Sequence, residues 1–479
     1  MCPAARCPPG IAEVTVIRMK RWPTFLLGIE FLAIVTFSLA YDSLDFRIYW
    51  LGGQAVTDGT RLYEEQLAAH WFTNTPFMAA LFTPLSVLPL TLARLLWQLA
   101  SLAAFIRACA TTLELAGRDV SLKVVVAGGL LLAPIWHSFF QGQVNILLLA
   151  LVLADMLRVA QGRPAGIGIG IAAAIKLTPG IFIVLLLVTR RTKDACTAAG
   201  TFAVCTLLAF AIAPDASRTY WLHTFFDTSR VGVPYISNQS PLGALTRVLR
   251  GTAEVGDWYT AIPLTIGVIG LSIAVAWARR GDWLTAVAVT GVTGLLVSPI
   301  SWAHHWVWVV PALAVLIRNN NRTIAACGYA LFAVELMWLT PYNDNPLQSG
   351  WHLLLIPVAN CYLMAALFFL THTAIRLRQR PPHITSPPPP RTSPAAAAAT
   401  HLGDAARPAS PVPAGDGTAA WSARPDGTLP VYSPRQAQQP GNRRASSAAT
   451  RSGSRSAAAH GVTAPPARPG IRGRTRRRR

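Results

Sequence analysis

The sequence predicts an all-α protein that crosses a membrane many times. Of the 479 residues, 52% are hydrophobic and only 13% are charged, and the mean hydropathy is +0.39. A typical soluble domain carries about 25% charged residues, because its whole surface faces water. Apolar runs near the roughly 20 residues that span the hydrocarbon core recur along the chain. These observations exclude an ordinary soluble enzyme and favour a polytopic membrane protein.

About twelve candidate spans follow one another, several of them short. They cover approximately residues 22–40, 92–116, 120–140, 144–157, 164–175, 177–189, 194–213, 258–279, 282–300, 303–317, 323–340 and 352–375. Clusters of arginine and lysine border these runs, and such clusters remain in the cytoplasm. With twelve spans every basic cluster falls on the cytoplasmic side. We therefore expect a membrane domain over 22–375, with a cytoplasmic N-terminal segment 1–21 and a cytoplasmic C-terminus.

The stretch 164–189 decides this topology, because it could form one long helix or two short ones. A single helix would place the basic clusters at its two ends on opposite sides of the membrane, against the charge bias. Lys176 and Pro179 also interrupt the apolar run. We expect a hairpin of two short helices here.

The resulting arrangement gathers most polar residues of the membrane domain on the external face. This face holds two long loops, 41–91 and 214–257, and the segments around Gln143, Lys176 and His304. Phe77–Leu90 within the first loop is apolar but short and proline-marked, so it should lie along the interface. We expect a plasma-membrane protein whose site opens to the extracytoplasmic side.

The C-terminal segment 376–479 holds most of the positive charge. It contains 18 arginines against three aspartates, which is +15 of the net +21. Its proline, alanine and arginine runs cannot form a core, so we expect a disordered tail attracted to anionic membrane lipids. The membrane body is then only mildly basic, and no nucleic-acid partner is expected.

Two carboxylates, Asp42 and Asp45, directly follow the first span. Ionisable groups at a membrane edge are functional candidates, and a carboxylate can serve as a general base. Asp42 could instead cap a helix, and Asp45 could simply pair with Arg47 or with a loop amide. The residues alone leave both interpretations open.

Positive and neutral polar groups suggest that the external face binds a phosphate and a sugar. The cationic candidates are His304, His305, Lys176 and Arg230, and the amide candidates are Gln143, Asn145, Asn238 and Gln239. Packing of the histidines or bonding of the amides at helix ends would explain the same residues without a ligand. A metal site is disfavoured, because adjacent helical residues point about 100° apart and no further ligand lies nearby.

Motifs for nucleotide binding or for a catalytic serine are missing from the sequence. An activated donor would therefore be carried by a lipid. We expect neither a cofactor nor a metal ion.

Several short motifs together resemble glycosyltransferase family 87. They are Asp45-Phe-Arg-Ile-Tyr49, Gly59-Thr-Arg-Leu-Tyr63, Phe82-Thr-Pro-Leu85, Gly142-Gln-Val-Asn145, Ile175-Lys-Leu-Thr-Pro179, Ser229-Arg-Val-Gly232, Asn238-Gln-Ser240 and Ser298-Pro-Ile-Ser-Trp-Ala-His-His-Trp-Val-Trp308. They occur in consistent order over about residues 20–375. The resemblance implies a GT-C type membrane glycosyltransferase, specifically an α-1,2-mannosyltransferase that uses polyprenyl-phosphate-mannose and extends phosphatidylinositol mannosides, lipomannan or lipoarabinomannan.

The same resemblance implies roles for individual residues. The family's essential aspartate falls on Asp45, which would deprotonate the acceptor hydroxyl. His304, His305, Lys176 and Arg230 would hold the donor phosphate, and a set of residues would bind sugar or acceptor: Arg47, Tyr49, Tyr63, Gln143, Asn145, Asn238, Gln239 and Trp302. A β-linked donor and an α product require inversion, which favours a single displacement. This sequence departs from the family at Asn74-Thr-Pro-Phe77, where a tyrosine and two prolines are usual.

Three other functions fit parts of the pattern. A lipid or sugar transporter would also place polar residues within broken helices, but along both halves of its path rather than on one face. A related enzyme could use a lipid-linked pentose. A scaffold protein would depend on its basic tail, so truncation after Pro381 would abolish its function.

Overall fold

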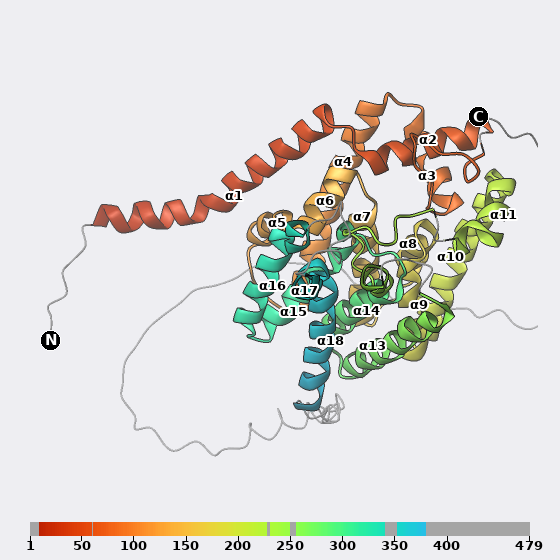
Figure 1. Cartoon of the computed structure of the whole chain (residues 1–479). Helices are drawn as coiled ribbons and strands as arrows, with labels where there is room; N and C mark the ends of the chain where they lie inside the picture. The colour runs from red at the N-terminus through yellow and green to blue at the C-terminus, as the bar shows by residue number, and fades with distance from the viewer. Residues whose placement is uncertain (1–8, 60, 228–229, 250–254, 341–351, 380–479) are drawn as a thin grey trace, which may run out of the picture. The chain divides into compact units, whose positions relative to one another are not determined.

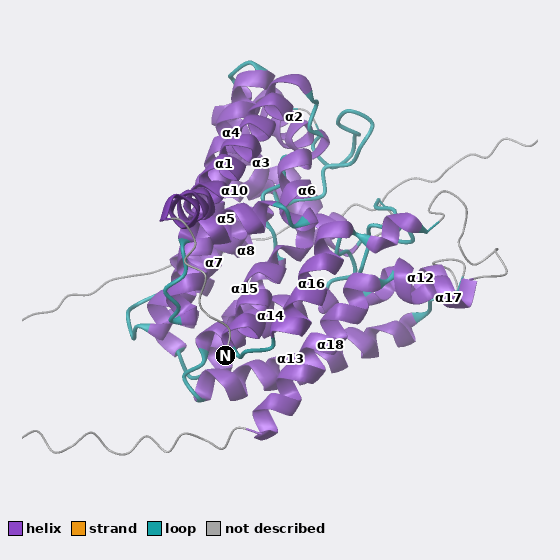
Figure 2. Ribbon diagram, turned by 90° about the vertical axis from the view of Figure 1, so that its left-hand side faces the viewer, coloured by secondary structure: helices purple, strands orange, loops and turns teal. Residues whose placement is uncertain are grey.

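The computed structural model describes residues 9–59, 61–227, 230–249, 255–340 and 352–379 (Figure 1). Within these residues all regular structure is helical, apart from two isolated β-bridges (Figure 2). The predicted all-α fold class is confirmed. The expected tail beyond residue 379 lies outside the described residues.

The helices follow one another with short connections. The first half of the chain forms α1 (Pro9–Ala40), α2 (Leu44–Asp58), α3 (Pro76–Ser86), α4 (Leu90–Ala116), α5 (Leu122–Leu130), α6 (Ala133–Gln141), α7 (Asn145–Ala160), α8 (Ile167–Ile175), η1 (Thr178–Gly180), α9 (Ile181–Val188) and α10 (Thr192–Ile212). The second half forms α11 (Pro214–Leu222), η2 (Thr224–Phe226), α12 (Pro241–Val248), η4 (Asp257–Thr260), α13 (Ala261–Arg279), α14 (Trp283–Val297), η5 (Ala303–Trp308), α15 (Val309–Arg318), α16 (Arg322–Val334), η6 (Leu336–Leu339), α17 (His352–Ala359) and α18 (Cys361–Gln379).

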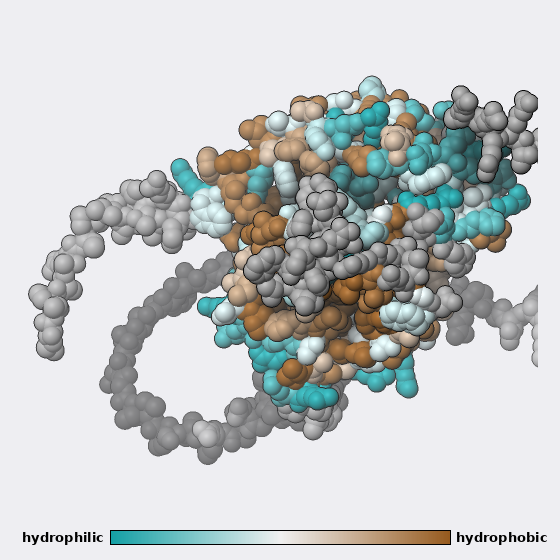
Figure 3. Space-filling view, in the orientation of Figure 1, coloured by the Kyte–Doolittle hydropathy of each residue, from teal (hydrophilic) through white to brown (hydrophobic). Residues whose placement is uncertain are grey.

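Among the described residues, four stretches of helix are long and apolar enough to cross a membrane. They are Arg21–Ala40 in α1, α4, α10, and Trp258–Arg279 across η4 and α13. Phe25, Leu207 and Val268 on three of these helices are each more than 60% exposed, as expected of side chains that face lipid. Figure 3 shows hydrophobic residues over much of the middle of one face, with hydrophilic residues above and below. The chain is therefore a multi-pass membrane protein.

Three of the expected spans are broken in the structure. The stretch 120–140 is not one straight helix, because α5 and α6 meet at an angle of 70°. Pro134 in the first turn of α6 has no backbone N–H, so it cannot donate to the preceding turn as a continuous helix from α5 would require. The stretch 323–340 breaks at Glu335, and 352–375 divides into α17 and α18.

The chain also breaks at Lys176, as the sequence predicts. This residue has extended backbone angles (φ −148°, ψ 128°) and separates α8 from η1 and α9. Two buried carboxylates hold the start of α8: Asp194 accepts from the Ala165 amide at 2.9 Å, and Asp155 accepts from the Ile169 amide at 2.8 Å. These bonds satisfy amides that a helix N-terminus leaves open. These bonds fix the start of α8, and with it the position of the break at Lys176, where α8 ends.

The segment 41–91, expected as the first external loop, contains two helices, α2 and α3. Helices α2 and α3 lie side by side (Figure 1), because Gly53 brings the two backbones together. A Cβ atom at Gly53 would stand 2.7 Å from the Phe82 carbonyl carbon. Phe77–Leu90, expected to lie along the interface, forms α3 with a buried face around Met78 and Phe82. This packing fixes the first turn of α2, where Asp45 lies.

Candidate active site

Asp45 lies in the first turn of α2 and is held by a residue distant in sequence. The Gln143 side-chain amide donates to Asp45 Oδ2 at 2.7 Å, and the Tyr49 hydroxyl donates to Gln143 Oε1 at 2.7 Å. Tyr49 and Gln143 are buried, whereas Asp45 is partly exposed. The bond from Gln143 thus orients the Asp45 carboxylate, and the partly exposed side chain can still contact a ligand.

Arg47 forms its salt bridge with Asp42 and not with Asp45. Arg47 contacts Asp42 at 2.6 Å, and Arg94 from α4 contacts its other oxygen at 3.4 Å. The pairing of Arg47 with Asp45 is therefore not the one formed. Asp42 does not cap α2 either, because Ser43 occupies the N-cap position. Asp42 joins α2 to α4, and Asp45 is left to face the site.

The position of Gln143 depends on a sharp turn between α6 and α7. Gly142 ends α6 with a φ of +70°, and a Cβ atom there would stand 2.5 Å from the Phe46 Cβ. Only glycine adopts this conformation without strain. Trp97 on α4 donates its indole N–H to the Gly142 carbonyl at 2.8 Å. The turn is locked against both α2 and α4.

Lys176, at the break after α8, meets the histidine segment. Its Nζ lies 2.8 Å from His305 Nε2 and 3.3 Å from Asn145 Oδ1. The Asn145 amide donates in turn to the His304 carbonyl at 2.9 Å. His305 is buried, while Lys176 is partly exposed. The cation is therefore positioned by α7 and η5 with its ammonium at a partly open face.

Asp45 and Lys176 act on each other electrostatically. Burial raises the pKa of the Asp45 carboxyl, while the charges of Lys176 and His70 act to lower it. Burial lowers the pKa of Lys176 to about 8, and Asp45 acts in the opposite direction. The site thus pairs a carboxyl group of increased basicity with a lysine whose pKa lies below its usual range.

His304 presents an open hydrogen-bonding position. Its ring lies 4.8 Å from that of His305, nearly perpendicular, and its Nε2 is buried without a hydrogen-bond partner. Buried polar atoms normally have a partner. No group of three or more metal-ligating side chains occurs among the described residues.

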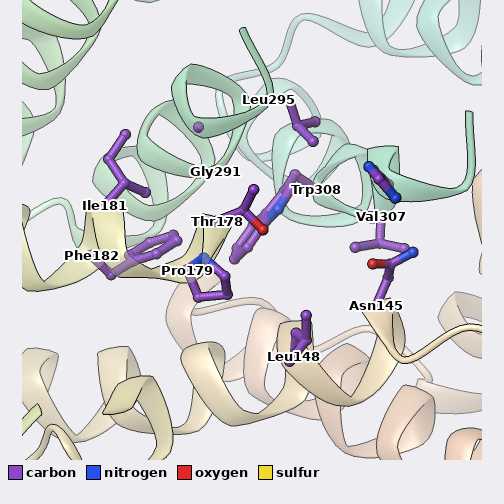
Figure 4. Close-up of a pocket in the computed structure, with 12 residues that line it drawn as sticks. Asn145, Leu148, Thr178, Pro179, Ile181, Phe182, Gly291, Leu295, Val307 and Trp308 are labelled. Atoms are coloured by element: carbon purple, nitrogen blue, oxygen red, sulfur yellow. The ribbon is translucent and has the colours of Figure 1, made fainter. Parts of the chain in front are cut away.

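A small cavity of about 30 Å³ lies behind the Lys176 and His305 contact. It is lined by Asn145, Thr178, Phe182 and Trp308 among others (Figure 4). Phe182 and Trp308 stack with ring centroids 5.0 Å apart. This volume holds about one water molecule, so the cavity does not admit a sugar.

Comparison with known proteins identifies the family. The sequence model of glycosyltransferase family 87 matches residues 72–299. A relative from Mycobacterium tuberculosis is 32% identical over 63% of this chain and 77% of its own length. The chain belongs to glycosyltransferase family 87. That M. tuberculosis relative is named a polyprenol-phosphate-mannose-dependent alpha-(1-2)-phosphatidylinositol mannoside mannosyltransferase.

Other relatives of this family 87 glycosyltransferase carry similar names. A protein with the same name from Mycolicibacterium smegmatis is 31% identical over 64% of this chain and 79% of its own length. A second M. tuberculosis protein, named for a pentamannoside acceptor, is 34% identical over 59% of this chain and 68% of its own length. No solved structure matches the chain.

The motif Asn238-Gln-Ser240 of the glycosyltransferase forms internal bonds. Asn238 Oδ1 accepts from the Ser301 amide at 2.9 Å, and Gln239 bridges the Ala359 carbonyl and the Tyr362 amide at 2.8 and 3.1 Å. Asn238 and Gln239 are fully buried. These amides hold the loop 214–257 against the segment before η5 and the junction of α17 and α18, and sugar binding by them stays a prediction.

Arg230 also has protein partners. It donates to Asp227 at 3.0 Å and to the Tyr63 carbonyl, and its guanidinium lies 4.7 Å from the centre of the Trp71 ring. Tyr63 is itself buried and donates to the Asn74 carbonyl at 2.7 Å. Arg230 therefore joins the loops 41–91 and 214–257, and its contact with donor phosphate stays a prediction.

The remaining predicted sugar ligands lie in different environments. The Arg47 side chain is exposed beside Asp42, whereas Trp302 is partly buried at the start of η5 with its ring 5.9 Å from Tyr235. The structure brings Asp45, Tyr49 and Gln143 together, and it joins Lys176 to Asn145 and the histidines. It gives no direct contact between Arg47 and these groups.

Two residues that the sequence analysis did not predict belong to the site of the glycosyltransferase. His70 acts on the charge of Asp45, and Asn74 lies beside Tyr49. Thr75 anchors this segment by donating to the Ala174 carbonyl at 2.5 Å, just before Lys176. No local pattern marks these residues, although the departure at Asn74–Phe77 pointed to the same loop.

Proposed function

We propose that this glycosyltransferase transfers mannose from polyprenyl-phosphate-mannose to a mannosylated glycolipid or lipoglycan, with an α-1,2 linkage. The observation that carries the proposal is the placement of two partly exposed groups close enough to interact electrostatically: Asp45, held by Gln143 at 2.7 Å, and Lys176, held by His305 at 2.8 Å. A base beside a fixed cation suits attack by a hydroxyl on a sugar that leaves a phosphate. The printed names of the mycobacterial relatives state this donor and a phosphatidylinositol mannoside acceptor.

Asp45 is the general base in this scheme. Its carboxylate takes the proton from the acceptor hydroxyl as the oxygen attacks the anomeric carbon of the donor. The raised pKa of Asp45 makes this transfer more favourable than it would be with an ordinary aspartate. Gln143 orients the carboxylate for the transfer.

Lys176 stabilises the leaving phosphate. The phosphate gains negative charge as the glycosidic bond breaks, and a cation fixed in advance stabilises that charge without rearrangement. His305 positions Lys176, and His304 and Arg230 supply further donors. The β-linked donor and α product make this one inverting displacement, and the scheme uses no metal ion or cofactor.

An apolar cavity is suited to the lipid chain of the donor. It has a volume of about 560 Å³ and lies between α15, α16 and α18, with Leu313, Leu331 and Phe369 in its lining. Trp306 of the histidine segment lines it too. A polyprenyl chain in this cavity would approach η5 from within the membrane.

The proposed topology has about twelve spans with both termini in the cytoplasm. The active site then opens on the extracytoplasmic side of the plasma membrane. The long loops that hold Asp45 and Arg230 lie on that side, where both lipid-linked substrates can reach them. The break at Lys176 supports this arrangement, because it fits two short helices that turn back at the external face.

The test uses purified enzyme in lipid nanodiscs with labelled polyprenyl-phosphate-mannose and a phosphatidylinositol mannoside. We expect label in the glycolipid, and its release by an α-1,2-specific mannosidase. Nucleotide-linked mannose and a polyprenyl-phosphate pentose serve as competing donors and should give no transfer. Transfer from the pentose donor alone, or no transfer from any donor, would contradict the proposal.

A further inference from the structure

A second buried carboxylate, Glu335, lies outside the chemistry assigned above. It is 5% exposed and follows α16 in the left-handed conformation, with φ 52° and ψ 61°. Non-glycine residues rarely adopt these angles, and such strain tends to occur at functional sites. Glu335 Oε2 accepts from the Trp338 indole N–H at 2.9 Å, and Oε1 lies 3.2 Å from the Tyr362 hydroxyl. The carboxylate is thus held in a defined orientation.

His137 joins this carboxylate to the active site. Its Nε2 lies 3.2 Å from Glu335 Oε2, and its side chain is 29% exposed. The next residue, Ser138, donates to the His304 carbonyl at 3.1 Å. His304 lies within electrostatic range of both His137 and Lys176. His304 therefore lies close to both Lys176 and the Glu335–His137 pair. Among the described residues, its Nε2 atom has no hydrogen-bond partner.

Aromatic rings surround the Glu335 and His137 pair. Trp338 lies 6.5 Å from His137 and 6.0 Å from Tyr235, and Tyr235 lies 5.9 Å from Trp302, all between ring centroids. Tyr235 is 46% exposed, whereas Trp302 and Trp338 are partly buried. An aromatic belt at the membrane edge would explain the rings alone. It would not explain a buried, strained carboxylate paired with a histidine in their midst.

This combination of groups suits a sugar. The apolar face of a pyranose ring packs on aromatic faces, and its hydroxyl groups need a few fixed acceptors and donors. Glu335 Oε1 keeps a second acceptor position beside its bond to Tyr362, and His137 and the His304 Nε2 supply further hydrogen-bonding positions. Helix α6 separates His137 from Gln143 by a distance on the order of 10 Å. That separation is on the scale of a disaccharide.

We propose that Glu335, His137, Trp338, Tyr235 and Trp302 form a second sugar subsite for the acceptor. It holds the sugar next to the one that Asp45 activates, so the enzyme selects acceptors with at least two mannosyl residues. This inference rests on the proposed function, because the activated sugar is placed at Asp45.

The test compares two soluble acceptors, an octyl monomannoside and an octyl dimannoside, with purified enzyme and polyprenyl-phosphate-mannose. The variants are Glu335→Gln, which keeps the size of the side chain, and Tyr235→Leu at the exposed rim. We expect Glu335→Gln to raise the KM for the dimannoside at least tenfold and Tyr235→Leu to raise it about threefold. The KM values for the monomannoside and for the donor should stay within twofold of the wild type in both variants. A general structural defect would instead change all three KM values, and this outcome or an unchanged dimannoside KM would overturn the subsite.

Binding without turnover separates this inference from the proposed function. Saturation-transfer NMR with methyl dimannoside should detect contact with the wild type and a loss of that contact in Glu335→Gln. If the wild type transfers no mannose but binds the dimannoside in this manner, the proposed reaction fails and the subsite stands. Equal signals from wild type and variant, or no signal from either, would overturn the subsite whatever the activity.

Discussion

The side-chain amide of Gln143 donates a hydrogen bond of 2.7 Å to the carboxylate of Asp45, although 98 positions separate the two residues in sequence. The bond connects the first turn of α2 with the turn between α6 and α7. It fixes one oxygen of the proposed base, and Tyr49 fixes the amide that makes the bond. The orientation of the catalytic carboxylate is thus set by three elements of the fold.

Replacing Gln143 should reduce catalysis without removing the base. Gln143→Leu deletes the donor to Asp45 and leaves the Tyr49 hydroxyl without its acceptor, so we expect kcat to fall about 10- to 100-fold. Gln141→Leu, two residues earlier, is the matched control and should keep kcat within threefold. Steady-state transfer assays with purified enzyme measure both. Equal loss in the two variants would show that the bond to Asp45 has no special role.

The pH dependence of transfer should be bell-shaped. Activity is lost as the pH falls through the raised pKa of Asp45, because the protonated acid cannot accept a proton. It is lost again as the pH rises past about 8, where Lys176 becomes neutral. Lys176→Arg keeps the charge to much higher pH, so the alkaline limb should move above about pH 10 while the acid limb stays. An alkaline limb that remains near pH 8 in this variant would remove Lys176 from the account.

Gly142→Ala should lower the free energy of unfolding more than Gly117→Ala does. Gly142 and Gly117 both end a helix with positive φ, +70° and +59°, but a Cβ atom meets Phe46 only at Gly142. We expect about 1 kcal/mol of destabilisation from the strained backbone alone in Gly117→Ala. Gly142→Ala should lose at least about twice as much, because the clash adds to the strain. Thermal unfolding of the two purified variants measures the difference, and equal melting temperatures would contradict the close packing of α2 on this turn.

Truncation after Arg380 should leave mannosyl transfer largely intact. The described parts of the site all precede this residue, and the tail contributes mainly positive charge. The truncated and full-length enzymes are compared in nanodiscs that contain neutral or anionic lipids. We expect kcat within about twofold of the full-length value. Complete loss of activity at normal expression would favour the scaffold interpretation instead.

The sequence predicted the helical class well, because apolar runs near the length of a membrane-spanning helix recur along the chain. It predicted the positions at which the helices break less well. The interruption at Lys176 is visible as a charged residue within an apolar run, whereas the break at Glu335 depends on partners from α6 and α18. Likewise, no local pattern assigns Asp42 to Arg94, which lies 52 positions away.

Candidate residues of the site could be identified from the sequence where they belong to a motif. Asp45, Lys176 and the two histidines are recognisable in the sequence, and the structure places them in one connected region. Motifs do not show which amides also bond within the protein, as Asn238 and Gln239 do, and sugar binding by these two residues stays a prediction. His70 enters the site only through the folding of its loop, which the sequence does not reveal.

The most direct test of the central claim compares Asp45→Asn with Asp42→Asn in the transfer of labelled mannose from polyprenyl-phosphate-mannose. Both variants lose one carboxylate from the same loop, but only Asp45 is proposed to accept the proton. We expect kcat/KM to fall about 10²- to 10⁴-fold in Asp45→Asn. Asp42→Asn should stay within a few-fold of the wild type, because Asp42 pairs with Arg47 and Arg94 and takes no part in the proposed proton transfer. Transfer by Asp45→Asn at the rate of Asp42→Asn would contradict the assignment of Asp45 as the base.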